Sequence, residues 1–394
     1  MGQKKVLVLN TLGADYQSFF IFYGLTQLLG TNRVVSFPPK MSHYGGKDIS
    51  PERTVGNTHY IGPGVDDPRR PWTELWIDPR WWRGWEINRW PGVPVAHGGP
   101  PGFQIPVPKP DKFYTFDDVL EGCLAGEFAF ILLADARWHS SAALSELQNL
   151  GVNLPVVFVD GEDYFQGRTD FVQAFGPKVY FKRSFIPGYT DYERIEQMGV
   201  PVRPLPFSSI WDYEFVPWED RTLDLFCVFG DTQVLRKKVA ELARDFASKH
   251  PDWKVCIEVG HPFSHAEYMD KIRHSKIVVD HQRLGVDTVR TWEVLSSGAC
   301  MIGDICLRMP DPLRDKEHFI QYENDMSPEG NKQKLETFVA ALDWAYNRPK
   351  QVQLIAEEGY RRVREFHTTV ARAKYVLRET AAVGVNLGDI GEVV

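Results

Sequence analysis

Short apolar runs separated by longer mixed stretches recur along most of the chain. Val6–Leu9 is a run of four apolar residues, and a stretch rich in apolar residues follows it from Phe19 to Leu29 and ends at Gly30. Short continuous apolar runs are typical of buried strands, whereas longer patterned stretches closed by glycine are typical of helices. Arg33–Phe37 predicts a second strand. Strands alternating with helices indicate a parallel, doubly wound sheet.

The same alternation resumes near residue 128. Buried-strand patterns occupy Phe128–Ala134, Leu154–Val159 and Val179–Phe181, and a helix is predicted at Ser140–Leu150. The stretch from Pro201 to about residue 217 predicts a linker because proline recurs in it and periodicity is lost.

A second series of strands and helices begins after this linker. The predicted strands are Leu223–Phe229, Trp253–Val259, Lys276–Asp280 and Ala299–Gly303, and the predicted helices are Thr232–Lys249, Ala266–His274 and Thr288–Ser297. Gly298 ends the last of these helices, and helical patterns dominate from Lys332 to Ala381. The sequence therefore predicts an α/β chain of two Rossmann-like domains, at about 1–210 and 220–365, with a helical tail at 366–394.

A proline- and tryptophan-rich segment at about 38–115 interrupts the first domain. It has no helical or strand periodicity and is too long for a simple connection, so we expect an insertion. Six tryptophans and five arginines lie between Arg69 and Trp90. Because aromatic rings stack on sugars or bases and arginine pairs with phosphate, Trp81, Trp82 and Arg83 are candidate acceptor-binding residues. The alternative is a tryptophan cluster that packs on itself.

Composition narrows the classes of function. A net charge of −7 excludes a strongly basic field over the whole molecule, although a local basic patch stays open. The five cysteines form no CxxC pair, which argues against a disulfide framework or a zinc site. The first apolar run is too short for a signal peptide, and no stretch approaches the roughly 20 apolar residues that cross a bilayer. These features predict a cytoplasmic protein.

Gly230 marks the first candidate site, because it stands between a predicted strand and a predicted helix. The exposed N–H groups at a helix start attract phosphate, and glycine lets a ligand approach the backbone closely. Gly230, Asp231, Thr232 and Arg236 are therefore candidate donor-binding residues. Strand, glycine and helix also follow one another in many α/β proteins that bind no phosphate.

Arg290 and Glu293 form the second candidate site. They are three residues apart and share one face near the start of a predicted helix. Arginine can bind a diphosphate with two parallel hydrogen bonds, and a carboxylate can accept both hydroxyls of a ribose. The alternative is a surface ion pair worth a few tenths of a kcal/mol, with Trp292 in the core.

Three stretches of the second half carry a resemblance to a known family. They run from Asp224 to Arg236, from Asp287 to Ala299 and from His318 to Arg372. Together they resemble, in order and spacing, the C-terminal domain of GT-B glycosyltransferases of the CgeB-like (spore-maturation-protein-like) group.

The resemblance implies a fold, an activity and roles for the matched residues. It implies two Rossmann-like domains, with the last helix returning to the first domain, and sugar transfer from a nucleotide-activated donor without a bound metal or cofactor. By resemblance Glu293 binds the ribose of the donor, Arg290 lies near its diphosphate and the Gly230 loop faces the phosphates. Many retaining members have a further glutamate where this chain has Gly285, so the resemblance does not predict the stereochemical class.

The first half offers candidates for the acceptor side. Asp160 and Asp163 follow a predicted strand and are equally admissible as the catalytic base that accepts the acceptor's proton; the alternative is a loop cap. Lys182 and Arg183 follow another strand and either bind an acceptor phosphate or are solvated.

His97 and His139 are further candidates for the base, and the alternative for both is a structural histidine. Three other functions stay open: sugar transfer to modified nucleobases of DNA, a different reaction on the same fold such as epimerisation or phosphorolysis, and non-catalytic binding of a nucleotide sugar or nucleic acid.

Overall fold

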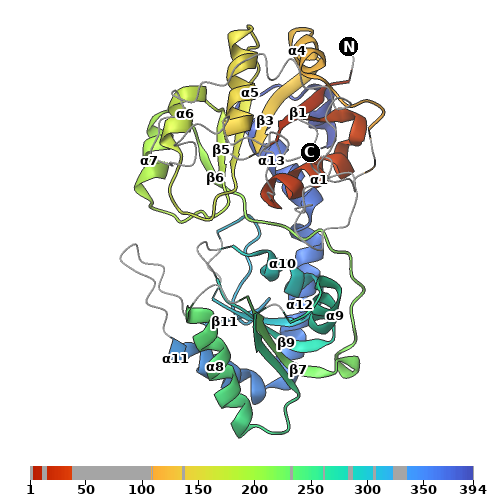
Figure 1. Ribbon diagram of the computed structural model, residues 1–394, viewed down its shortest axis with the longest axis vertical. Coiled ribbons are helices and arrows are strands. Elements are labelled where there is room, and N and C mark those ends of the chain that lie inside the picture. Colours follow the sequence, from red (N-terminus) through yellow and green to blue (C-terminus); the bar gives the residue numbers. More distant parts are fainter. Residues whose placement is uncertain are drawn as a thin grey trace, which may run out of the picture. The chain divides into compact units, whose positions relative to one another are not determined.

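The computed structural model describes residues 3–10, 16–37, 108, 110–134, 138–230, 234–260, 262–282, 287–304, 308–322 and 335–393. The chain folds into two compact units, of which the first comprises Met1–Leu205 and Thr369–Val394 and the second comprises Pro206–Thr368 (Figure 1). Each unit is built on a parallel sheet with helices between its strands. The predicted α/β class with two Rossmann-like halves is therefore confirmed. Most of the predicted insertion at 38–115 lies outside the described residues.

The first unit contains a six-stranded sheet in the order β2-β1-β3-β4-β5-β6. Its elements are β1 (Lys5–Leu9), α1 (Tyr16–Leu29), the 3-10 helix η1 (Thr31–Arg33), β2 (Val34–Phe37), α4 (Phe116–Leu124), β3 (Phe128–Ala134), α5 (Trp138–Asn149), β4 (Val156–Asp160), α6 (Thr169–Phe175), β5 (Val179–Lys182), α7 (Thr190–Gln197), β6 (Val202–Pro204), α13 (Thr369–Ala382) and η5 (Gly388–Val393). Every residue of β3 is buried, as expected for a central parallel strand covered on both faces.

Helix α13 belongs to the first unit although it follows the whole second unit in sequence. It packs along α1, as Figure 1 shows, and Val376 and Leu377 join the same apolar core as Phe22. Gly24 on α1 lies so close to the main chain of Thr369 that a β-carbon there would overlap it. The absence of a side chain at this position permits the close approach of the two helices.

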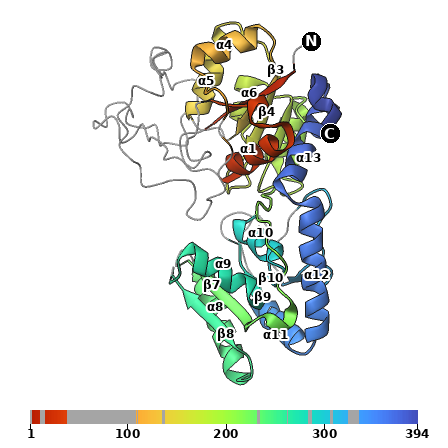
Figure 2. The ribbon, with the colours of Figure 1, turned by 90° about the vertical axis from the view of Figure 1, so that its right-hand side faces the viewer.

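The second unit contains a five-stranded sheet in the order β11-β10-β9-β7-β8. Its elements are the 3-10 helix η4 (Trp218–Asp220), β7 (Leu223–Phe229), α8 (Val234–Lys249), β8 (Val255–Val259), α9 (His265–Arg273), β9 (Ser275–Asp280), α10 (Val289–Ser296), β10 (Cys300–Gly303), β11 (Ile320–Gln321), α11 (Leu335–Tyr346) and α12 (Pro349–Phe366). The long helix α12 lies beside β10 and α10 (Figure 2).

The two faces of this second sheet are covered by different helices. Leu225 and Cys227 of β7 join the apolar core with α8 and α11, whereas Phe226 contacts the Tyr268 ring of α9 at a centroid distance of 5.7 Å. Side chains of successive strand residues point to opposite faces, so this alternation follows from the strand geometry.

One edge of the second sheet collects the carboxyl ends of its strands. Gly230 follows β7, His281 follows β9 and Asp304 follows β10, and these three strands are neighbours in the sheet. In doubly wound sheets ligands bind beyond the carboxyl ends of the strands. This edge is therefore the expected location of a ligand site in the second unit.

The prediction of a linker beginning at Pro201 was wrong for its first residues. Val202–Pro204 forms β6, which pairs with β5 and completes the first sheet, and the second unit begins at Pro206. Proline is tolerated here because β6 is an edge strand, where an N–H on the outer side needs no partner. No helix in the described residues is both long enough and apolar enough to pass through a lipid bilayer.

Candidate functional site

Arg290 and Glu293 lie in the first two turns of α10, at the carboxyl edge of the second sheet. The helix begins after Thr288, whose hydroxyl accepts a hydrogen bond from the Thr291 N–H at 3.3 Å. It ends before Gly298, which has a left-handed φ of 76° that favours glycine. The predicted helix and its glycine stop are thus confirmed.

The carboxyl group of Glu293 is buried, with 7% of the residue exposed. The Tyr268 hydroxyl donates to its Oε2 at 3.4 Å. Burial raises the pKa of Glu293 to about 7, because the charged form is desolvated; the positive charge of Arg290 opposes this rise and the negative charge of Asp280 adds to it. The surface ion pair considered from the sequence does not describe so buried a carboxylate.

The Arg290 guanidinium lies close to two aromatic rings. Its carbon is 4.9 Å from the centroid of Phe229 and 5.5 Å from that of Tyr268. Burial lowers the pKa of Arg290, but the neighbouring Tyr268 hydroxyl and the carboxylates of Asp280 and Glu293 outweigh this effect, so that the pKa of Arg290 is raised. A permanent cation is therefore held beside Glu293 at the start of α10.

Asp280, the last residue of β9, is a buried carboxylate that the sequence analysis did not select. Its Oδ2 accepts hydrogen bonds from Thr288 Oγ1 at 2.9 Å and Thr291 Oγ1 at 2.7 Å, which fasten the first turn of α10 to the sheet. Its Oδ1 is buried and has no hydrogen-bond partner in the described part of the chain. An aspartate ending an otherwise apolar strand was the sequence signal for this residue.

Gly230 and Arg236 lie on the neighbouring strand-to-helix connection. Arg236, in the first turn of α8, donates from Nη2 to the carbonyl oxygen of His281 at 3.0 Å, and its guanidinium carbon is 5.7 Å from the Phe229 ring centroid. Of the predicted donor-binding residues, Gly230, Arg236, Arg290 and Glu293 thus come to one edge of one sheet. Asp231 and Thr232 lie outside the described residues.

Trp292 is fully buried, in agreement with its predicted place in the core. Its indole Nε1 donates to Asp287 Oδ1 at 3.0 Å, and Asp287 Oδ2 accepts a hydrogen bond from the Phe207 N–H. The bond from Trp292 orients α10 from its buried side, so that Arg290 and Glu293 are presented on a fixed helix.

In the first unit, Asp160 and Lys182 form a buried ion pair. Lys182 Nζ lies 3.0 Å from Asp160 Oδ2, and both side chains are at most 1% exposed. Asp160 also accepts hydrogen bonds from the Tyr180 hydroxyl and from the Glu162 N–H. Burial lowers the pKa of Lys182, and the charge of Asp160 opposes that shift. The two groups therefore neutralise one another at the carboxyl ends of β4 and β5.

Asp163 and Arg183 form a second ion pair close by. The Asp163 side chain is 43% exposed, whereas Arg183 is nearly buried. Of the two predicted aspartates, Asp163 is thus the one whose carboxylate reaches solvent.

His97, Trp81, Trp82 and Arg83 lie outside the described residues, and His139 belongs to α5 with a side chain that is likewise outside them.

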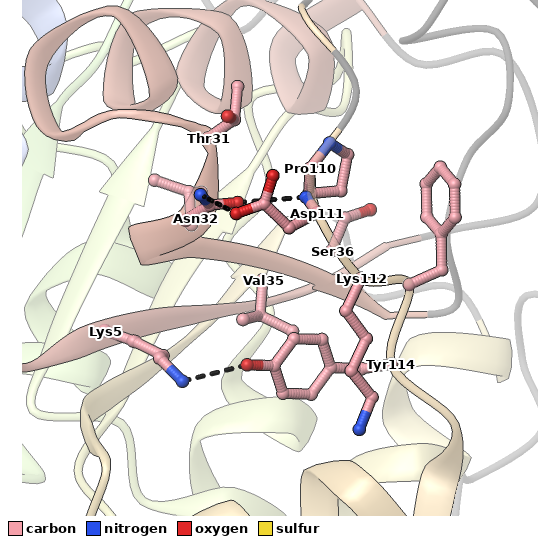
Figure 3. A pocket seen from close by; sticks show the side chains of 11 residues that line it. Lys5, Thr31, Asn32, Val35, Ser36, Pro110, Asp111, Lys112 and Tyr114 are labelled. Atoms are coloured by element: carbon pink, nitrogen blue, oxygen red, sulfur yellow. Dashed lines mark hydrogen bonds between the residues drawn. The ribbon is translucent and has the colours of Figure 1, made fainter.

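A cavity of about 230 Å³ lies at the opposite, amino-terminal edge of the first sheet (Figure 3). Lys5 and Lys112 contribute its amines, and the Lys5 amine donates to the Tyr114 hydroxyl at 2.8 Å. Each amine is also paired with a carboxylate, Lys5 with Glu127 and Lys112 with Asp118. Because its charges are balanced and it lies away from the carboxyl ends of the strands, this cavity is not the candidate site.

Comparison with known proteins shows a family similarity that covers most of the second unit. Residues 226–378 match a family model described as glycosyl transferase-like. The matched segment includes the strands, the loop at Gly230 and the helix that carries Arg290 and Glu293. No curated protein sequence matches the chain.

Solved structures that are similar to the chain include three sugar-transferring or related proteins. A glycosyltransferase from Rickettsia africae ESF-5 is similar with a TM-score of 0.53 and 9% identity, over 97% of this chain and 99% of that one. A sucrose-phosphate synthase from Thermosynechococcus elongatus has a TM-score of 0.48 and 12% identity, over 97% of this chain and 100% of that one. A GtfA/B complex has a TM-score of 0.46 and 11% identity over 70% of this chain, which spans 62% of that chain's length.

These comparisons confirm the fold and the general class. The chain has the two-unit fold of GT-B glycosyltransferases, as predicted, and residues 226–378 are similar to the glycosyl transferase-like family. The match over residues 226–378 supports the predicted transferase class. The narrower resemblance to the CgeB-like group stays a prediction.

Proposed function

We propose that this protein transfers a sugar from a nucleotide-activated donor to a hydroxyl group of an acceptor, without a bound metal ion. The observation that carries the proposal is the buried carboxylate of Glu293 with Arg290 one turn before it on α10, at the carboxyl edge of a sheet within the segment that matches a glycosyl transferase-like family.

The donor nucleotide would bind along this edge. The ionised carboxylate of Glu293 can accept hydrogen bonds from both ribose hydroxyls, and a carboxylate already withdrawn from water makes such bonds strong. Arg290 lies in the first turn of α10 and Arg236 in the first turn of α8, and their positive charges can balance the negative charge of the diphosphate. The N–H groups at the start of α8 would add to that positive field.

The chemical step breaks the bond between the anomeric carbon and the diphosphate oxygen. The acceptor oxygen bonds to that carbon, its proton passes to a base, and the nucleoside diphosphate leaves with the electron pair. Arginines and helix dipoles aimed at the leaving group can stabilise its charge in place of a metal. Activity would then persist in the presence of a chelator.

The acceptor and the base belong to the first unit in this proposal. Asp163 is preferred to Asp160 because its carboxylate, although paired with Arg183, is 43% exposed, whereas Asp160 is buried and held by Lys182, Tyr180 and a main-chain N–H. Asp160 would then hold the loop that carries Asp163. His97 stays a candidate base, and Trp81, Trp82 and Arg83 stay candidates for binding the acceptor.

A donor-hydrolysis assay tests the proposal. The purified protein would be incubated with a panel of UDP-, GDP-, ADP- and CDP-sugars, with and without EDTA, and release of the nucleoside diphosphate followed by chromatography. We expect one nucleotide class to be cleaved, with EDTA having no effect, and Glu293→Ala to abolish cleavage. Glu241→Ala, which removes an exposed carboxylate on α8, is the matched control. Absence of cleavage and of binding across the panel would refute the proposal.

A further inference from the structure

His281 is a fully buried histidine at the carboxyl end of β9. Its Nδ1 lies 3.0 Å from Asp304 Oδ2 and 2.6 Å from the Tyr322 hydroxyl. Asp304 is itself held by the main-chain N–H of Gln282, which donates to Oδ1 at 2.9 Å. The Nδ1 atom of the imidazole is therefore anchored by Asp304, which follows β10, and by Tyr322, which follows β11.

This anchoring determines the state of the ring. An ionised carboxylate oxygen only accepts hydrogen bonds, so the distance between Asp304 Oδ2 and Nδ1 favours the tautomer with a proton on Nδ1, which then donates to both Asp304 and the Tyr322 hydroxyl. With a proton on Nδ1, Nε2 can donate a hydrogen bond only when the ring is positively charged. The Asp304 carboxylate also balances the positive charge when both nitrogens are protonated.

The second nitrogen, Nε2, is buried and has no hydrogen-bond partner among the residues that the structure describes. Buried polar atoms are nearly always hydrogen-bonded, and a ring held so closely at one nitrogen presents the other in a defined direction. An orphaned nitrogen in an anchored ring thus indicates a ligand that completes the hydrogen bond.

The neighbours of His281 indicate the chemistry of that ligand. Its carbonyl oxygen accepts the hydrogen bond from Arg236 in the first turn of α8, and the Phe229 ring, next to Gly230, lies 6.4 Å away. The helix α8 has 16 residues, so its amino terminus carries a substantial positive dipole. The helix dipole, Arg236 and a protonated histidine would together stabilise an anion at the start of α8.

We propose that His281, held by Asp304 and Tyr322, binds the diphosphate of the donor through Nε2 in its protonated form. This inference rests on the proposed function and adds a residue to the same site. When the diphosphate binds, the ring takes a proton from solvent and forms the Nε2–H bond, which donates to a phosphate oxygen; no bond of the diphosphate breaks.

Two substitutions separate a ligand contact from a structural anchor. The side-chain amide of asparagine reaches the place of Nδ1, and that of glutamine reaches the place of Nε2. His281→Asn therefore retains the contact with Asp304 and loses the proposed contact with phosphate, and His281→Gln does the reverse. His250→Asn, which removes a ring at the far end of α8, is the matched control.

The measurement is calorimetric titration with the nucleoside diphosphate that the wild-type protein binds, with its nucleoside and with inorganic pyrophosphate. We expect His281→Asn to weaken diphosphate and pyrophosphate binding by about tenfold to a hundredfold, as for loss of a charged hydrogen bond, with nucleoside binding unchanged. His281→Gln should stay within about threefold of wild type, because its amide restores a neutral donor.

The reverse order, with His281→Asn normal and His281→Gln impaired, would overturn the inference and make His281 an anchor. Equal losses for nucleoside and diphosphate would also overturn it. If neither variant folds, the wild-type protein decides: the His281 ring protons, identified by their proximity to Tyr322, should shift in NMR spectra on addition of pyrophosphate, and an unchanged spectrum refutes the contact. Wild-type protein that binds no nucleoside diphosphate refutes the proposed function itself.

Discussion

The buried carboxylate of Glu293 should lower the free energy of unfolding of the unliganded protein, although the same carboxylate binds the donor. The perturbation is Glu293→Gln, which keeps the shape of the side chain and the acceptor for Tyr268 but cannot ionise. Burial raises the pKa of Glu293 from 4.5 to about 7. The folded state thus binds this proton more tightly than the unfolded state does.

The sign of the effect follows from linkage. Between pH 4.5 and 7 the folded protein holds the proton that the unfolded chain has lost, so the free energy of unfolding falls as pH rises and is level above pH 7. A shift of about 2.5 units corresponds to a ceiling of roughly 3 kcal/mol at pH 8, since each unit is worth about 1.4 kcal/mol. At pH 4 both states hold the proton, and the effect vanishes.

The assay is thermal unfolding by calorimetry at pH 5 and pH 8. Glu293→Gln should unfold several degrees above wild type at pH 8, with a much smaller difference at pH 5, and Glu241→Gln should match wild type at both. Donor binding should be lost in Glu293→Gln at both pH values. Equal or greater stability of wild type at pH 8 would refute the reasoning, because it would mean that the charged carboxylate is favourably placed without a ligand.

Two further predictions concern the first unit. Lys182→Met should lower the free energy of unfolding by about 3–5 kcal/mol, because Asp160 would be left as an uncompensated buried charge. Chemical denaturation at pH 7 measures this loss. The double variant with Lys182→Met and Asp160→Leu should lose less stability, because neither buried charge remains. Replacement of Trp81 and Trp82 together by Ala should reduce sugar transfer about tenfold or more while donor hydrolysis persists, since stacking contributes roughly 1–3 kcal/mol per ring. A parallel fall of both activities and of the melting temperature would instead make these tryptophans scaffold.

The strands could be predicted from sequence because most of them are buried on both faces. Phe128–Ala134 is a continuous apolar run and Leu223–Phe229 is apolar except for Asp224, and both form strands with the predicted bounds. Helix α7 was missed because its eight residues are mostly polar, and only Tyr192 and Ile195, three positions apart, reach the core. The edge strand β6 was missed because three residues with a proline carry no pattern.

The candidate site could be predicted only where its residues are close in sequence. The spacing of Arg290 and Glu293 indicated a shared helix face, and the structure adds the rings of Phe229 and Tyr268 around them. The partners of His281 are 23 and 41 residues away, and only the order of strands in the sheet brings them together. Contacts set by strand order leave no local signal in the sequence.

The most direct test of the central claim is an experimental structure of the protein with the nucleoside diphosphate of its donor. The account predicts that both ribose hydroxyls lie about 3 Å from the Glu293 carboxylate and that the diphosphate lies within hydrogen-bond reach of Arg290 or Arg236. A nucleotide bound elsewhere, or one whose ribose does not contact Glu293, would contradict it.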